Sequence, residues 1–126
     1  MKLNFICRLV KDVPQTVHFW REVMQRPITY YDESIGYASV DTGGTTLAIF
    51  RQAAFSRMLN MEIPESCHTY LSFQVENLDT TFADLIRRGA KELLPPQDFP
   101  ALHARQAYVC DPEGYLIQLY SSLQAQ

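Results

Sequence analysis

The segment Asp111-Pro112-Glu113-Gly114-Tyr115-Leu116-Ile117 predicts a tight turn that leads into a β-strand. Proline presets the backbone of one central turn position, and glycine tolerates the positive φ of a later one. The residues that follow, from 115 to 121, are mainly aliphatic and aromatic, which is typical of strands. We therefore expect a β-hairpin whose second strand is residues 115–121.

The same pattern occurs a second time in the chain. A shift of 70 positions places Asp41-Thr42-Gly43-Gly44 on the turn at Asp111 and Leu47-Ala48-Ile49-Phe50 on Ile117-Gln118-Leu119-Tyr120. A shift of 65 positions places Val10-Lys11-Asp12-Val13 on Val75-Glu76-Asn77-Leu78. Matches that recur in the same order indicate an internal duplication.

Each half predicts one strand, one helix and then three strands. Asp12 and Asn77 precede the two helical patterns as side-chain caps, and Gly89 ends the second helix. The fold class is therefore α+β, a single domain over residues 1–126 made of two tandem βαβββ modules. The modules cover about residues 1–52 and 67–126, and residues 53–66 are expected as a linker. The expected strands are residues 3–10, 28–31, 37–40, 45–50, 69–76, 91–94, 106–110 and 115–121.

Composition excludes several classes of function. The 126 residues are 47% hydrophobic and 20% charged, as in ordinary globular domains. There is no apolar run of about 20 residues for a membrane span, and the net charge of −3 leaves no basic stripe for nucleic acid. Three cysteines without a Cys-x-x-Cys pair suggest reduced thiols, and no signal-peptide pattern is seen. We expect a cytoplasmic protein without nucleic-acid or membrane partners.

The chain resembles the vicinal-oxygen-chelate superfamily, which includes glyoxalase I, bleomycin-resistance proteins, fosfomycin-resistance transferases and ring-cleaving dioxygenases. The resemblance rests on three segments: Val10-x-Asp12-Val13 leading into Phe19-Trp20-Arg21-Glu22, Phe73-x-Val75-x-x-Leu78-Asp79, and Asp111-Pro112-Glu113-Gly114-Tyr115-Leu116-Ile117. It implies paired βαβββ modules whose mixed sheets curve into a cup, usually completed in a homodimer.

In metal-dependent members of this family, His or Glu side chains at four strand positions hold one divalent ion. The resemblance places these positions on Phe5, Ala48, Tyr70 and Gln118. Phenylalanine and alanine have no donor atom, tyrosine is a poor ligand unless deprotonated, and glutamine offers one neutral carbonyl oxygen. We therefore expect no metal and no cofactor, and catalytic residues stay unidentified.

The alternation of each strand predicts what lines the cup instead, because residues two apart share a face. The face contains several aromatic rings and a few polar groups, as in pockets for organic ligands. A cation at the loop that borders the cup could contact an anionic ligand. The expected ligand-binding residues are Phe5, Cys7, Ala48, Phe50, Tyr70, Ser72, Gln118 and Tyr120, with Arg105 as the cation at the rim. The alternative is that the same side chains fill the cup as a second core.

Three functions follow from these alternatives. The leading one is a metal-free protein that binds a hydrophobic or aromatic small molecule, for drug or toxin sequestration as in antibiotic-resistance members. The second is a lyase, isomerase or dioxygenase with atypical metal ligands. The third is an interaction or regulatory module with a filled cup. Arg8 is unexplained, because its parity points it toward the helices where its counterpart Phe73 packs. Either it pairs with Glu22 or the strand slips there.

Overall fold

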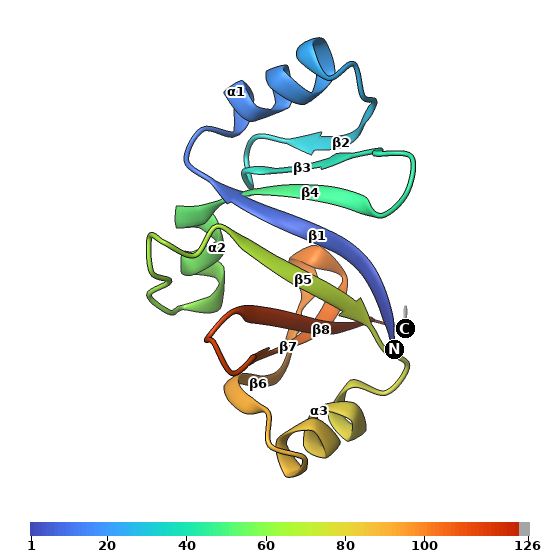
Figure 1. Cartoon of the computed structure of the whole chain (residues 1–126), viewed down its shortest axis with the longest axis vertical. Coiled ribbons are helices and arrows are strands. Elements are labelled where there is room, and N and C mark those ends of the chain that lie inside the picture. The colour runs from blue at the N-terminus through green and yellow to red at the C-terminus, as the bar shows by residue number, and fades with distance from the viewer. Residues whose placement is uncertain (124–126) are drawn as a thin grey trace. The chain divides into compact units, whose positions relative to one another are not determined.

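The computed structural model describes residues 1–123, which form two compact units (Figure 1). The N-terminal unit is Phe5–Thr69, and the C-terminal unit combines Met1–Asn4 with the residues from Tyr70 onward. Each unit contains the order of one strand, one helix and three strands, so the predicted pair of βαβββ modules is confirmed. No helix among these described residues is long and apolar enough to cross a membrane.

The N-terminal unit pairs four strands in the order β2-β3-β4-β1. Strands β1 and β4 run parallel, and the other neighbouring pairs are antiparallel, which makes the sheet mixed as expected. A short π-helical turn, labelled η1, continues the first helix. The elements are β1 (Lys2–Val10), α1 (Val13–His18), η1 (Phe19–Val23), β2 (Ile28–Asp32), β3 (Tyr37–Val40) and β4 (Thr46–Arg51).

Helix α1 begins where the sequence places its cap. The Asp12 carboxylate accepts a hydrogen bond from the backbone N–H of Gln15 at 2.9 Å, which satisfies one free donor of the first turn. The helix then packs its apolar face on β3 and β4. Val13 and Val17 of the helix form a buried cluster with Ala38, Val40 and Ile49 of the sheet.

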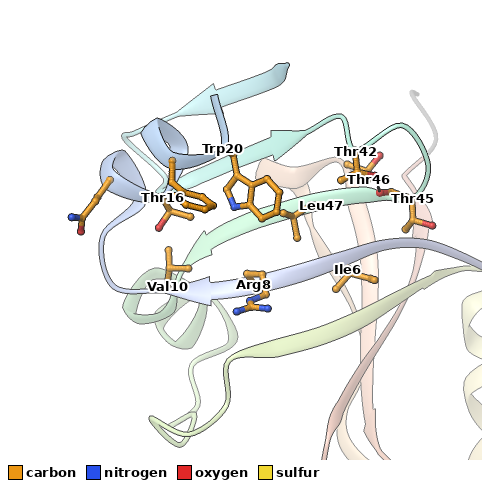
Figure 2. Close-up of a pocket in the computed structure, with 11 residues that line it drawn as sticks. Ile6, Arg8, Val10, Thr16, Trp20, Thr42, Thr45, Thr46 and Leu47 are labelled. Atoms are coloured by element: carbon orange, nitrogen blue, oxygen red, sulfur yellow. Dashed lines mark hydrogen bonds between the residues drawn. The ribbon is translucent and has the colours of Figure 1, made fainter. Parts of the chain in front are cut away.

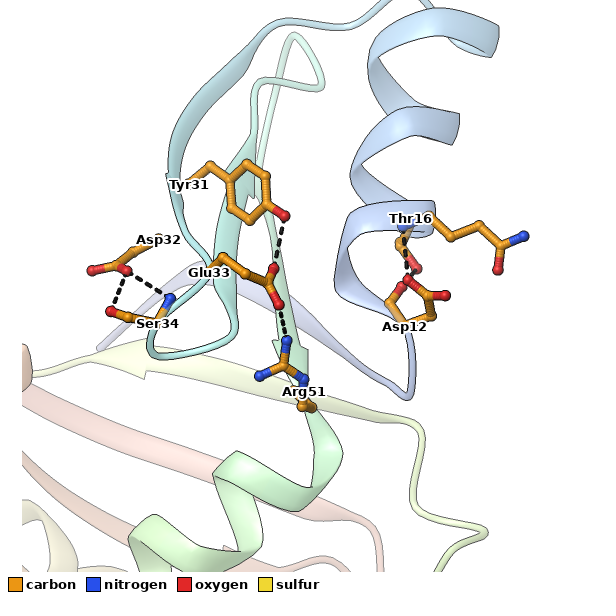
Figure 3. Close-up of polar contacts among 8 residues, drawn as sticks. Asp12, Thr16, Tyr31, Asp32, Glu33, Ser34 and Arg51 are labelled. Carbon is orange, nitrogen blue, oxygen red and sulfur yellow. Dashed lines mark hydrogen bonds and ion pairs between the residues drawn. The ribbon is translucent and has the colours of Figure 1, made fainter.

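The turn between β2 and β3 is tied to the end of β4. The Tyr31 hydroxyl donates to the Glu33 carboxylate at 2.7 Å, and the same carboxylate forms an ion pair with Arg51 (Figure 3). This hydrogen bond raises the pKa of Tyr31 above its usual value. Gly36 has a φ of +69°, and a Cβ there would lie 2.9 Å from the Cβ of Arg51. Glycine is therefore required for Arg51 to approach this turn.

The expected irregular linker contains a helix, α2 (Gln52–Leu59). Phe55 and Leu59, one helical turn apart, are both buried, so one face of α2 packs against the protein. At the start of the helix, the Gln52 side-chain amide donates to the backbone carbonyls of Pro64 and Cys67, which follow the helix, at 3.2 and 3.0 Å. Part of the segment 53–66, which the sequence predicts as a linker between the modules, is therefore helical and packed.

The C-terminal unit pairs its strands in the order β5-β8-β7-β6, with β5 and β8 parallel. Strand β6 extends well beyond the expected residues 91–94 although it contains Pro95 and Pro96. It is the last strand in the order, and its pairing with β7 shifts between Leu94 and Gln97. An edge strand with an irregularity tolerates the missing N–H groups of proline. The elements are β5 (Thr69–Gln74), α3 (Leu78–Arg87), β6 (Lys91–Phe99), a 3-10 turn (Pro100–Leu102), β7 (Ala104–Cys110) and β8 (Leu116–Ser122).

The turn at Asp111–Gly114 joins β7 to β8 as predicted. The Gly114 N–H donates to the Asp111 carbonyl at 2.9 Å, and Gly114 has a φ of +87°. The Asp111 carboxylate accepts from the N–H groups of Glu113 and Tyr115, both at 2.9 Å. These hydrogen bonds hold the turn that reverses the chain between two antiparallel strands.

Candidate functional site

In the N-terminal unit the predicted site residues lie on β1 and β4. The parallel register pairs Cys7 with Ala48 and Leu9 with Phe50. Cys7, Ala48 and Phe50 are buried, whereas Phe5 is only partly buried. The Phe50 ring makes edge contacts with two other rings, Tyr37 at 5.3 Å and Phe55 at 5.6 Å between centroids. The structure thus brings these residues together on one apolar face, as their parity predicts.

In the C-terminal unit the predicted residues lie on β5 and β8. The parallel register pairs Ser72 with Gln118 and Gln74 with Tyr120. The Ser72 hydroxyl donates to the Gln118 side-chain carbonyl in a short hydrogen bond, and both side chains are buried. The two strands therefore place a polar pair on a face that also carries the buried Tyr70 ring.

The polar pair continues into β7, through two residues that sequence reasoning did not select. The Gln118 side-chain amide donates to the Tyr108 hydroxyl at 2.6 Å, and that hydroxyl donates to the Gln106 side-chain carbonyl at 2.8 Å. All four side chains from Ser72 to Gln106 are buried. We call this chain of hydrogen bonds the glutamine–tyrosine relay, made of Ser72, Gln118, Tyr108 and Gln106.

The relay has one direction, since each donor in it points to an acceptor of the next residue. Every buried side-chain nitrogen and oxygen within residues 1–123 has a hydrogen-bond partner, so the relay causes no unpaired polar atom. The Tyr70 ring lies edge-on to the Tyr108 ring, with 6.2 Å between centroids. A fully satisfied chain of buried hydrogen bonds holds its members in one arrangement.

Tyr120 is a further predicted site residue, and it is only partly buried. The Tyr120 hydroxyl accepts a hydrogen bond from the Asn4 side-chain amide, and burial raises the pKa of this tyrosine. Tyr120 therefore stays a neutral phenol at physiological pH and offers hydrogen bonding rather than a base.

Arg105 is held by two carboxylates. It contacts both oxygens of Asp79 at 2.9 and 3.1 Å and the Asp98 carboxylate at 2.9 Å. The guanidinium lowers the pKa of Asp79 below its usual value. Arg105 of β7 thus joins Asp98 of β6 to Asp79 at the start of α3. These contacts inside the protein account for the position of its side chain.

The donor atoms at the family's four metal positions do not fit a divalent ion. Phe5 and Ala48 carry only carbon, and the carbonyl oxygen of Gln118 is already occupied by Ser72. Within residues 1–123, no three His, Cys, Asp or Glu side chains gather closely enough to hold a metal ion. We therefore derive no chemistry through a metal at these positions.

Comparison with known proteins agrees with this fold. Residues 2–119 match the sequence profile of the Glyoxalase/Bleomycin resistance protein/Dioxygenase superfamily. The chain is 30% identical to the uncharacterized protein YraH of Bacillus subtilis, covering 98% of this chain and 100% of YraH. It is 25% identical to the metallothiol transferase FosB of Shouchella clausii, covering 98% of this chain and 82% of FosB.

A solved structure supports the same fold. It is a glyoxalase/bleomycin resistance protein/dioxygenase superfamily member from Vibrio splendidus, with a TM-score of 0.68 at 14% identity. The match covers 94% of this chain and 97% of the other.

Proposed function

Because the chain belongs to the Glyoxalase/Bleomycin resistance protein/Dioxygenase superfamily, we propose that it binds a hydrophobic or aromatic small molecule without a metal. We propose further that it does so as a homodimer and serves to sequester a drug or toxin. The observation that carries the proposal is the glutamine–tyrosine relay. One of its members, Gln118, stands at one of the four positions that the resemblance assigns to metal ligands in metal-dependent relatives.

The relay retains hydrogen-bonding capacity for a guest. Among the described residues, the Gln118 amide nitrogen makes one hydrogen bond, to Tyr108, although it carries two hydrogens. The Ser72 oxygen donates to Gln118 and keeps lone pairs that can accept. A ligand with an aromatic body and one carbonyl or hydroxyl group matches this combination, since the ring would stack on Tyr70 and the polar atom would reach Gln118.

A thermal-shift screen of aromatic compounds, followed by titration, tests this proposal. We expect Tyr70→Ala to weaken the binding of a hit about tenfold or more, because stacking adds to the apolar area that the ring buries. Tyr115→Ala is the matched control, since Tyr115 lies in the same unit and is 68% exposed. Hits that bind Tyr70→Ala as tightly as the parent, or a screen in which no compound raises the Tm, would refute the proposal.

An enzyme with atypical metal ligands is the second candidate, and the similarity to a metallothiol transferase favours it. The donor set argues against it, because two of the four positions carry only carbon. We expect purified protein to contain well under one equivalent of zinc, nickel, iron or manganese by elemental analysis. A stoichiometric divalent ion that chelation removes together with a measured transferase, lyase or dioxygenase activity would establish the enzyme instead.

A filled face is the third candidate, and burial favours it. Cys7, Ala48, Tyr70, Ser72 and Gln118 are all buried within the described chain. In that case the relay is part of the core, and the protein acts through its outer surface as an interaction or regulatory module. The ligand screen distinguishes a ligand-binding face from a filled one, because a filled face gives no hits whose binding depends on Tyr70.

A further inference from the structure

The N-terminal unit contains a cavity, which we call the Arg8 groove (Figure 2). It has a volume of about 890 Å³ and lies between the helical segment and strands β1 and β4. Figure 2 shows Trp20 reaching from the helical segment toward Leu47, with Arg8 on the neighbouring β1. The lining that matters here is Ile6, Arg8, Phe19, Trp20, Thr46 and Leu47.

The Arg8 groove is separate from the proposed ligand face. On β1 the side chains of Ile6 and Arg8 point to the opposite side from Cys7, because successive residues of a strand alternate. The register pairs Ile6 with Leu47 without any slip between Phe5 and Val10. The groove therefore opens on the helix-covered side of this sheet.

The internal duplication shows what is unusual about Arg8. At the equivalent position the second half has Phe73, which packs against the buried cluster beneath α3. The first half places a guanidinium there instead. The expected partner Glu22 is paired with Arg21 at 3.0 Å, and no hydrogen bond or ion pair of the Arg8 side chain occurs within residues 1–123.

The groove places this exposed cation beside apolar and aromatic side chains. Arg8 is its one charged lining residue among the described part of the chain. The π-helical turn η1 places Phe19 and Trp20 in edge-to-face contact, with 5.7 Å between centroids. Phe19 remains 44% exposed, so its ring is accessible. Turns of this kind are rare and occur often at functional sites.

We propose that the Arg8 groove binds a small organic monocarboxylate with an apolar body. A planar guanidinium matches a carboxylate through two parallel hydrogen bonds, and a single cation suits a single negative charge. The apolar body would lie against Trp20, Phe19 and Leu47. This proposal does not depend on a ligand at the relay.

The test uses Trp20, which is the one tryptophan of the chain and therefore reports on this groove alone. Octanoate is titrated into the protein while tryptophan emission is recorded, and octanol serves as the uncharged match. We expect a saturable change with octanoate and binding of octanol weaker by about tenfold or more, since the charged hydrogen bonds are lost. Arg8→Gln should weaken octanoate by a similar factor, and the exposed control Arg88→Gln should leave it unchanged.

Arg8→Phe is the second variant, because it installs the residue that the duplicated half uses. It should retain the fold, as judged by its Tm, and abolish the response to octanoate. Equal binding of octanoate and octanol, or undiminished octanoate binding by Arg8→Gln or Arg8→Phe, would overturn the proposal. A Trp20 emission change that follows protein concentration and not octanoate would also overturn it, since a second copy would then cover the groove.

Discussion

Replacing Phe55 by alanine is expected to lower the free energy of unfolding by about 3–5 kcal/mol, the usual cost of removing a buried aromatic ring. Phe55 has no exposed surface, and its ring contacts Phe50 at 5.6 Å. The substitution keeps a good helix former in α2, so the loss comes from packing rather than from helix propensity. Such a loss is a large part of the stability of a domain of this size.

Urea unfolding followed by circular dichroism measures the effect, and the Tm should fall by about 10–20 °C. Arg57→Ala in the same helix is the control, because this side chain is exposed. A Phe55→Ala protein as stable as the control would mean that α2 is not packed on the protein in solution, and the segment would then be the linker that its sequence predicts.

Helix α2 could not be recognised from its sequence for identifiable reasons. It has eight residues, and only Phe55 and Leu59 form a buried pair at helical spacing. Its N-terminal cap, Arg51, makes no side-chain hydrogen bond to the first turn, so the usual start signal is missing. Tertiary packing, rather than local propensity, therefore determines this helix.

The two main helices and the hairpin turn carry local signals, and these were predicted correctly. Asp12 and Asn77 each accept a hydrogen bond from the backbone N–H three residues later, at 2.9 and 3.1 Å. Gly114 adopts the positive φ that its place in the turn requires. Such features depend on a few neighbouring residues, so the sequence is sufficient to place them.

The candidate site was predictable only in part. Strand parity selected Ser72 and Gln118, which the structure joins by a hydrogen bond. It did not select Tyr108 or Gln106, because their role depends on the antiparallel register of β7 with β8, which pairs Tyr108 with Gln118. That register follows from the length of the Asp111 turn, so extending the parity argument across the hairpin would have found both residues.

Gln118→Leu is expected to lower the free energy of unfolding by about 1–3 kcal/mol, because it removes two buried hydrogen bonds and the acceptor of the buried Ser72 hydroxyl. Ser72 would lose its acceptor and Tyr108 would lose a donor. Gln97→Leu is the matched control, since Gln97 is an exposed strand residue in the same unit. Urea unfolding of both variants measures the difference. Equal free energies of unfolding for the two variants would show that the relay does not stabilise the fold.

A double-mutant cycle of Gln118→Leu with Tyr108→Phe separates the two roles of the relay. If the hydrogen bonds act as one unit, the double variant should lose less stability than the sum of the single variants. If the relay serves only the core, the variants should lose stability while they bind every aromatic hit as tightly as the parent. If the relay also serves recognition, the variants should in addition lose their preference for ligands with a matching polar atom, because removal of a hydrogen-bonding group abolishes discrimination of this kind. Measuring both quantities on the same variants thus decides whether the buried polarity of this face stabilises the protein alone or also selects its ligand.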